Sequence, residues 1–203
     1  MAAPRVHAAV RVLRRDPVMR RVIEAVGPPR EYYRERTDFE TVSRIIVGQQ
    51  LSFAAATTIW RRVSLLAPGW VPKDVARLDA RDLRSGGLSG SKTRFILEAA
   101  RRVVDGDLDF RRIRRLDDDA AAAALRDIKG FGPWSVDMFL IFGLGRDDVF
   151  SPGDAGLRRA VCTLYGVSRA AYERRVEGIA DAWRPWRSHA CRYLWGWLDV
   201  GGG

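Results

Sequence analysis

The chain has 203 residues, 47% of them hydrophobic, and is long enough to bury a core, which excludes an intrinsically disordered tail. Its formal net charge of +10 favours a polyanionic partner, either nucleic acid or an anionic membrane surface. No apolar run approaches the roughly 18 residues that cross a bilayer, so no membrane-spanning helix is expected.

The predicted elements are helices nearly throughout, because apolar residues recur with a helical period and no segment alternates like a strand. The Arg-rich start, residues 1–15, continues to Gly27 as one amphipathic helix, which we interpret as part of the fold rather than as a transit peptide. Thr37 with Glu40 three residues later predicts a capping box. Ser52 predicts the N-cap of the following helix. Five apolar residues of that helix are expected to face inward: Phe53, Ala56, Ile59, Trp60 and Val63.

Beyond a break at residues 68–72, the same periodicity predicts six more helices. They are expected over residues 91–104, 117–128 and 134–145, and starting near Asp154, Ser168 and Pro185. Cys162 and Cys191 fall in apolar helical surroundings and are expected to be buried thiols rather than a disulfide or a metal pair. His7 and His189 are too scattered to indicate a metal centre. The predicted fold class is all-α, in two lobes with a cleft.

The stretch "IKGFGPW", residues 128–134, carries two glycines one residue apart. Gly130 and Gly132 permit backbone conformations closed to other residues and let another group approach the main chain closely. Pro133 then starts a helix whose first amides point outward with the positive end of the helix dipole, as a phosphate site requires. The segment therefore predicts either a backbone clamp for a phosphate or a plain corner between two helices.

About 20 residues later, Pro152 and Gly153 predict a turn, and Asp154 stands where the next helix begins. By itself, Asp154 is expected to be an N-cap. A glycine hairpin, an apolar helix and then Pro-Gly-Asp, in that order, nevertheless resemble the helix-hairpin-helix DNA glycosylases. Four blocks resemble successive parts of the 3-methyladenine DNA glycosylase II family: residues 39–60, 87–100, 128–161 and 184–198.

This resemblance implies a two-lobed helical fold with the active site in the cleft between the lobes. The central lobe would cover residues 35–150, and the terminal lobe residues 1–34 and 151–203. It implies a short form without the β-rich N-terminal domain that some members carry. It also implies an enzyme that flips an alkylated base, such as 3-methyladenine or 7-methylguanine, out of the duplex and cleaves its N-glycosidic bond.

The resemblance also assigns roles in the pocket. Asp154 matches the carboxylate that stabilises the positive charge developing on the deoxyribose or activates water. Asp137 is the rival carboxylate, although the helix dipole explains it adequately. Trp134 and Trp195 match the pair of rings that stack on the base, with core packing as the alternative for each. Met138 stands where some relatives place an aromatic pocket wall.

Four further residues are candidates for contact with DNA. Lys92 lies in a turn, "LSGSK", that resembles a DNA-contacting loop of the family. Lys129, where the family usually has a proline or a small residue, would add a phosphate contact beside Gly130 and Gly132. The family residue that matches Gln50 fills the gap left by the flipped nucleotide. Whether Gln49 or Gln50 is this wedge stays open, and so does a plain solvated loop.

Relatives that also cut the DNA backbone place a lysine nucleophile where Trp134 stands, so the resemblance implies a monofunctional enzyme that leaves an abasic site and uses no cofactor or metal. The expected partner is double-stranded DNA containing damaged bases. We expect a cytoplasmic, nucleoid-associated monomer with no membrane contact and no obligate protein partner. Two alternatives stay open: a helix-hairpin-helix DNA-binding module without enzymatic activity, and a glycosylase for oxidised or mismatched bases.

Overall fold

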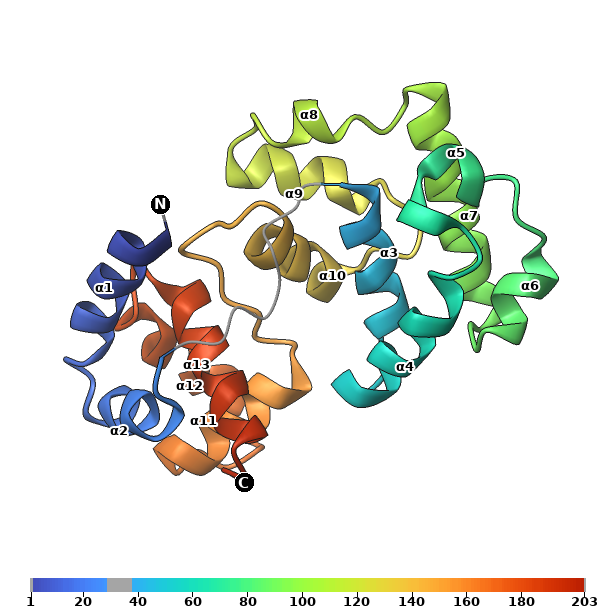
Figure 1. The fold of residues 1–203 in the computed structure, drawn as a ribbon. Helices are drawn as coiled ribbons and strands as arrows, with labels where there is room; N and C mark the ends of the chain where they lie inside the picture. Colours follow the sequence, from blue (N-terminus) through green and yellow to red (C-terminus); the bar gives the residue numbers. More distant parts are fainter. Residues whose placement is uncertain (1, 29–37, 203) are drawn as a thin grey trace. The chain divides into compact units, whose positions relative to one another are not determined.

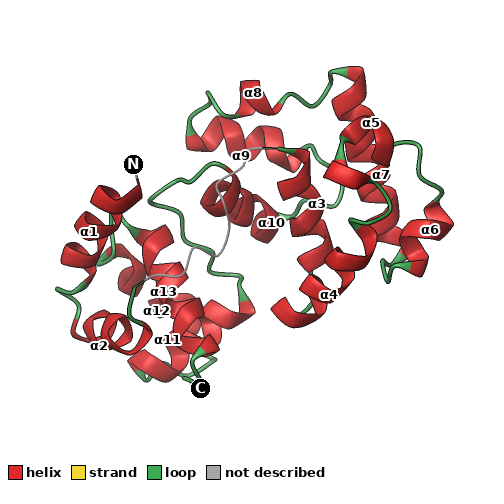
Figure 2. Cartoon of the chain, in the orientation of Figure 1, coloured by secondary structure: helices red, strands yellow, loops and turns green. Residues whose placement is uncertain are grey.

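The computed structural model describes residues 2–28 and 38–202. Their regular structure is entirely helical, which confirms the predicted fold class; Figure 2 shows helices joined by loops. No helix among the described residues is long and apolar enough to cross a membrane. Packing divides the chain into two compact units: a central unit, residues 38–144, and a terminal unit, residues 2–28 with 145–202. The chain leaves the central unit after Leu144, a few residues before the boundary expected at residue 150.

The terminal unit is built from the two ends of the described chain, blue and orange to red in Figure 1. Its helices are α1 (Ala2–Leu13), α2 (Pro17–Val26), α11 (Ala155–Tyr165), α12 (Tyr172–Asp181) and α13 (Arg187–Asp199). Helix α13 packs against α11, α2 and α1, and its buried face meets a core that includes Met19, Leu157 and Trp183. Helices α12 and α13 begin later than the predicted starts at Ser168 and Pro185.

The prediction of one N-terminal helix is wrong, because the chain breaks between α1 and α2 at Asp16. Asp16 is the N-cap of α2, and its Oδ1 accepts hydrogen bonds from the backbone N–H groups of Val18 and Met19. Its Oδ2 accepts from the hydroxyl of Tyr165 and from the indole N–H of Trp183. The break is therefore held by partners far along the chain, which amphipathic periodicity cannot reveal.

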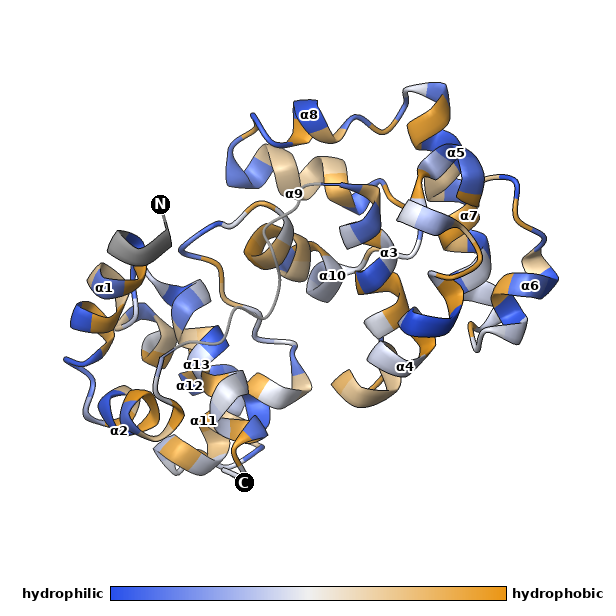
Figure 3. Ribbon diagram, in the orientation of Figure 1, coloured by the Kyte–Doolittle hydropathy of each residue, from blue (hydrophilic) through white to orange (hydrophobic). Residues whose placement is uncertain are grey.

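The central unit consists of shorter helices around α7 and α3. Its elements are α3 (Phe39–Gly48), α4 (Phe53–Val63), the 3-10 turn η1 (Pro68–Trp70), α5 (Pro72–Val75), α6 (Ala80–Ser85), α7 (Gly90–Asp105), α8 (Phe110–Ile113), α9 (Asp118–Arg126), α10 (Pro133–Met138) and the π-helical turn η2 (Phe139–Gly143). Helix α7 packs against α3, α5 and α6, while α10 and η2 pack against α3 and α9. These helices carry both hydrophobic and hydrophilic residues, as helices that bury only one face do (Figure 3).

Helix starts in the central unit test the predicted caps. The N-cap of α3 is Asp38, whose Oδ1 accepts from the backbone N–H of Thr41 at 3.0 Å, so the predicted capping box is wrong; Thr37 itself lies outside the described residues. The Ser52 cap of α4 is confirmed. Phe53 is 61% exposed rather than turned inward. The buried residues of α4 are Trp60 and Val63 near its C-terminal end, whereas Ala56 and Ile59 are partly buried.

Both cysteines are free thiols, as predicted. Cys191 is buried in the core of the terminal unit, and Cys162 is partly buried against that core. Neither forms a disulfide.

Candidate active site

Asp154 occupies the first position before α11 in the terminal unit. As the N-cap, its Oδ1 accepts a hydrogen bond from the backbone N–H of Leu157 at 2.8 Å, so the structural role predicted from the sequence is real. The same oxygen also accepts from the indole N–H of Trp195 on α13, at 3.0 Å. The carboxylate is half-buried. A half-buried carboxylate held by two donors has a fixed orientation, which a catalytic group needs.

Gly156 makes room for this pair, a role that was not predicted from the sequence. A Cβ atom at this position would lie 3.1 Å from Oδ1 of Asp154 and 3.4 Å from Cδ1 of Trp195. Glycine in the first turn of a helix is unfavourable compared with alanine, so its presence inside α11 was the available signal. The close spacing indicates that the first turn of α11 is shaped around the Asp154–Trp195 pair.

Trp195 combines the two roles considered for it. It is half-buried and packs against the core of the terminal unit, as the alternative reading of core packing requires. Its indole N–H nevertheless points to the candidate catalytic carboxylate rather than to a backbone carbonyl. Trp183 is fully buried and Trp197 partly buried, so both contribute to the core of the terminal unit.

The hairpin between α9 and α10 has one glycine that the fold requires and one that it does not. Gly130 has φ of 84°, and a Cβ atom there would overlap the ring of Phe95. Gly132 is extended, and a Cβ atom there would meet nothing within 4 Å. Gly132 is the N-cap of α10 without a side-chain cap, and Pro133 follows at the first helical position. The fold therefore explains Gly130, whereas Gly132 leaves the backbone at the start of α10 open to an approaching group.

Trp134 and Met138 follow the hairpin on α10. Trp134 is half-buried, whereas Met138 is only 5% exposed. Lys129, just before Gly130, has an exposed side chain whose ammonium lies 3.2 Å from a carboxylate oxygen of Glu98. An exposed ion pair of this kind contributes little to stability, so Lys129 is available to exchange its partner for a phosphate.

Lys92 lies in the first turn of α7, and Gln50 lies just after the end of α3, both in the central unit. The ammonium of Lys92 donates to the carbonyl oxygens of Val47 at 2.9 Å and Gln49 at 2.7 Å. Burial lowers the pKa of Lys92 below its usual value. Gln50 is exposed and has φ of 57°, in the left-handed region that residues other than glycine seldom adopt. The structure thus brings Lys92 next to the turn that carries Gln50.

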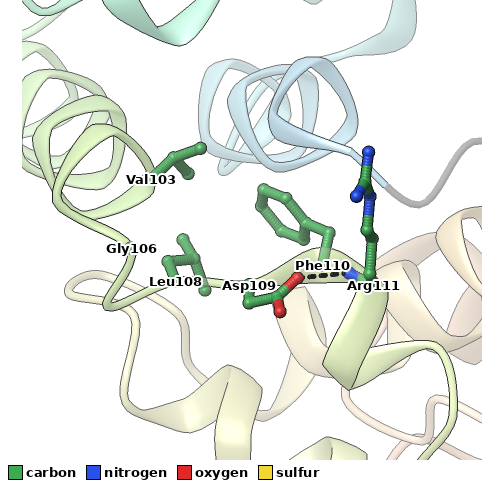
Figure 4. A pocket seen from close by; sticks show the side chains of 6 residues that line it. All are labelled: Val103, Gly106, Leu108, Asp109, Phe110 and Arg111. Atoms are coloured by element: carbon green, nitrogen blue, oxygen red, sulfur yellow. Dashed lines mark hydrogen bonds between the residues drawn. The ribbon is translucent and has the colours of Figure 1, made fainter.

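A hollow of about 450 Å³ in the central unit contains none of the predicted site residues. It is lined by Val103, Gly106, Leu108, Asp109, Phe110 and Arg111, where α7 ends and α8 begins (Figure 4). Its one carboxylate, Asp109, accepts the backbone N–H of Arg111 at 2.8 Å as the cap of α8. The carboxylate of Asp109 therefore has a structural role as a helix cap, and the residues that line the hollow are separate from the candidate site residues.

Comparisons with known proteins identify the family. A sequence profile described as HhH-GPD superfamily base excision DNA repair protein matches residues 43–186. The chain belongs to this superfamily. The matched segment includes the glycine hairpin and Asp154.

Individual relatives carry related names. DNA-3-methyladenine glycosylase 1 of Schizosaccharomyces pombe is 27% identical to the chain over 89% of it and 82% of the relative. A solved DNA-3-methyladenine glycosidase from Bacillus halodurans is 33% identical, with a TM-score of 0.74 over 92% of this chain and 86% of that one. The chain spans 58% and 61% of two Bacillus subtilis relatives.

The fold of the superfamily extends over nearly the whole chain. A 3-methyladenine DNA glycosylase of Schizosaccharomyces pombe, solved in complex with abasic DNA, has a TM-score of 0.87 over 97% of this chain and 98% of that one. At 24% identity this similarity shows a shared fold. The resemblance stated from four sequence blocks is therefore confirmed at the level of superfamily and fold.

Proposed function

We propose that the chain is a monofunctional DNA glycosylase that excises alkylated bases from double-stranded DNA in base excision repair and leaves an abasic site. The observation that carries the proposal is the carboxylate of Asp154, which lies at the start of α11 and is oriented by a hydrogen bond from the indole N–H of Trp195. Membership of a base excision repair superfamily and the names of the relatives support it. 3-Methyladenine and 7-methylguanine are the proposed substrates.

The chemistry follows from the charge that develops during cleavage. Breaking the N-glycosidic bond leaves positive charge on the deoxyribose, and the anionic carboxylate of Asp154 stabilises that charge or activates the attacking water. An alkylated base already carries positive charge, which weakens its bond to the sugar and favours contact with electron-rich rings. Trp134 and Trp195 supply such rings in this proposal, and Met138 forms a pocket wall.

DNA binding rests on the central unit. The backbone at Gly130 and Gly132 holds a phosphate, and Lys129 adds charge next to it. Lys92 retains a third N–H donor after its two bonds to α3, which a phosphate oxygen can accept. Gln50 fills the gap left by the flipped nucleotide, in keeping with its exposed side chain. The logarithm of the affinity for DNA should therefore fall linearly with the logarithm of the salt concentration.

The decisive experiment is base release from a duplex containing one 7-methylguanine. The wild type should release the free base, and Asp154→Asn should abolish release while DNA affinity stays nearly unchanged, because the amide keeps the shape and loses the charge. Wild-type turnover by Asp154→Asn would refute the assignment. The matched Asp137→Asn variant tests the rival carboxylate and should remain active.

Two further measurements define the reaction. Borohydride should trap no covalent adduct with DNA, since Trp134 stands where bifunctional relatives carry a lysine; a trapped species would overturn the monofunctional assignment. Met138→Tyr should narrow the range of excised lesions, because a flexible thioether shapes a pocket less rigidly than an aromatic ring. We also propose a monomer without an obligate protein partner, which sedimentation of the wild type would test.

The second candidate is a DNA-binding module without enzymatic activity. The exposed turn and the hairpin of the central unit would serve such a module equally well, so binding alone does not separate the two. Binding to alkylated duplex without release of a base by the wild type would favour the module.

A further inference from the structure

The side chain of Gln49 joins the end of α3 to the hairpin, 81 residues further along the chain. Its amide nitrogen donates to the carbonyl oxygen of Gly130 at 2.8 Å and to Oγ of Ser135 at 2.9 Å. Ser135 is 2% exposed, so this end of the bond is buried. A glutamine amide has only two N–H donors, and both are used here.

The backbone of Gln49 is held as firmly as its side chain. Its carbonyl oxygen accepts from the ammonium of Lys92 at 2.7 Å, and its backbone N–H donates to the carbonyl oxygen of Ile45 at 3.2 Å. A positive charge at the C-terminal end of a helix is favourable, because the last carbonyl groups there lack partners within the helix. Lys92, at the first turn of α7, thus completes the end of α3.

Gln50, the next residue, differs from Gln49 in exposure and in backbone conformation. Its side chain is exposed, and its backbone adopts φ of 57° immediately after the residue that Lys92 and the hairpin hold. The left-handed region is unfavourable for glutamine, and such a conformation persists where neighbouring contacts enforce it. The hydrogen bonds of Gln49, the residue immediately before Gln50, are neighbouring contacts of this kind.

We infer that Gln49 is a positioning residue that ties the turn carrying Gln50 to the hairpin at Gly130. The wedge and the phosphate clamp then move as one body and meet a duplex in one register. The inference rests on the proposed function, because it takes a flipped nucleotide as the origin of the gap that Gln50 fills. It also distinguishes the two glutamines: Gln49 would have to break its hydrogen bonds to Gly130 and Ser135 to enter DNA, whereas the exposed side chain of Gln50 can enter the duplex while those bonds stay in place.

The experiment uses binding, so that it does not depend on catalysis. Affinity is measured for a duplex with one tetrahydrofuran abasic site and for the same duplex intact; the ratio of the two is the gap preference. The wild type should show such a preference, because a missing base removes most of the cost of flipping. Gln50→Ala should reduce it. Gln49→Leu, which removes both hydrogen bonds, should reduce it by about tenfold.

The double variant decides how Gln49 acts. If Gln49 works through Gln50, Gln49→Leu with Gln50→Ala should lose no more gap preference than Gln50→Ala alone, because coupled residues are not additive. Losses that multiply would overturn the inference, and so would a full gap preference in Gln49→Leu. Equal weakening on both duplexes would also overturn it, since Gln49 would then support only the phosphate clamp.

A second pair of variants guards against misfolding. Ser135→Ala removes one acceptor from the hairpin side and should reduce the gap preference by about threefold. Ser64→Ala, after α4, touches neither the turn nor the hairpin and should leave it unchanged. Failure of the proposed function appears separately: a wild type that keeps the gap preference but releases no methylated base refutes catalysis, and the binding cycle still decides the role of Gln49.

Discussion

The indole N–H of Trp195 donates a hydrogen bond to Oδ1 of Asp154, the same oxygen that accepts from the backbone N–H of Leu157. A tryptophan that also packs on the core of the terminal unit therefore sets the direction of the candidate catalytic carboxylate. The arrangement couples the packing of this unit to the geometry of the candidate catalytic group.

Trp195→Phe should lower the single-turnover rate of base release by about tenfold, because it keeps an aromatic ring and removes a hydrogen bond to a charged group. Affinity for undamaged DNA should not change. Trp197→Phe on the same helix is the matched control and should keep the rate. An unchanged rate in Trp195→Phe would show that the indole serves only packing or stacking.

Gly156→Ala should also slow base release, since the new methyl group would crowd Oδ1 of Asp154 at 3.1 Å. Gly178→Ala in α12 is the control, because a Cβ atom there meets nothing within 4 Å. That control should stabilise the terminal unit by about 0.5–1 kcal/mol and leave the rate intact. Equal rates in the two variants would argue against a shaped first turn of α11.

Gly130→Ala should destabilise the central unit by about 2–4 kcal/mol, because the left-handed backbone disfavours a side chain and the methyl group would overlap the ring of Phe95. Urea unfolding measures the change. Gly132→Ala, extended and open, should cost little. Similar losses in both variants would mean that the whole hairpin, rather than one position, is conformationally demanding.

Lys92→Met should destabilise the central unit by about 1–3 kcal/mol, because two charge-assisted hydrogen bonds to α3 are lost. If the third N–H contacts a phosphate, the substitution should also reduce the slope of log affinity against log salt concentration by about one. Lys73→Met is the control for charge alone. An unaltered slope together with reduced stability would limit Lys92 to its structural role.

The terminal unit should lose stability in alkali. Burial and the hydrogen bond to Asp16 raise the pKa of Tyr165 above its usual value, which is near 10 in the unfolded chain. A raised folded pKa means that the contribution of Tyr165 is complete below about pH 10 and is lost as the pH rises further. Urea midpoints measured between about pH 8 and 11 should fall less steeply for Tyr165→Phe than for the wild type. Parallel curves would assign the effect to other tyrosines.

The amino-acid sequence alone was sufficient for the features that depend on near neighbours. Helical periodicity, the Ser52 cap and the Asp154 cap each involve residues within four positions, so the sequence contains all the partners. The order of the hairpin and Asp154 was likewise sufficient for the family resemblance. Where a cap had a close competitor, as at Thr37 and Asp38, the prediction missed by one residue.

The tertiary structure decided what distant segments do to one another. Asp154 and Trp195 are 41 residues apart, and Gln49 and Ser135 are 86 apart, so no local pattern pairs them. The same holds for Gly130 and Gly132, which look alike in sequence and differ because the ring of Phe95, on another helix, lies against only one of them. Hydrogen bonds and steric exclusion between atoms act over a few ångströms, and tertiary packing determines which residues come that close.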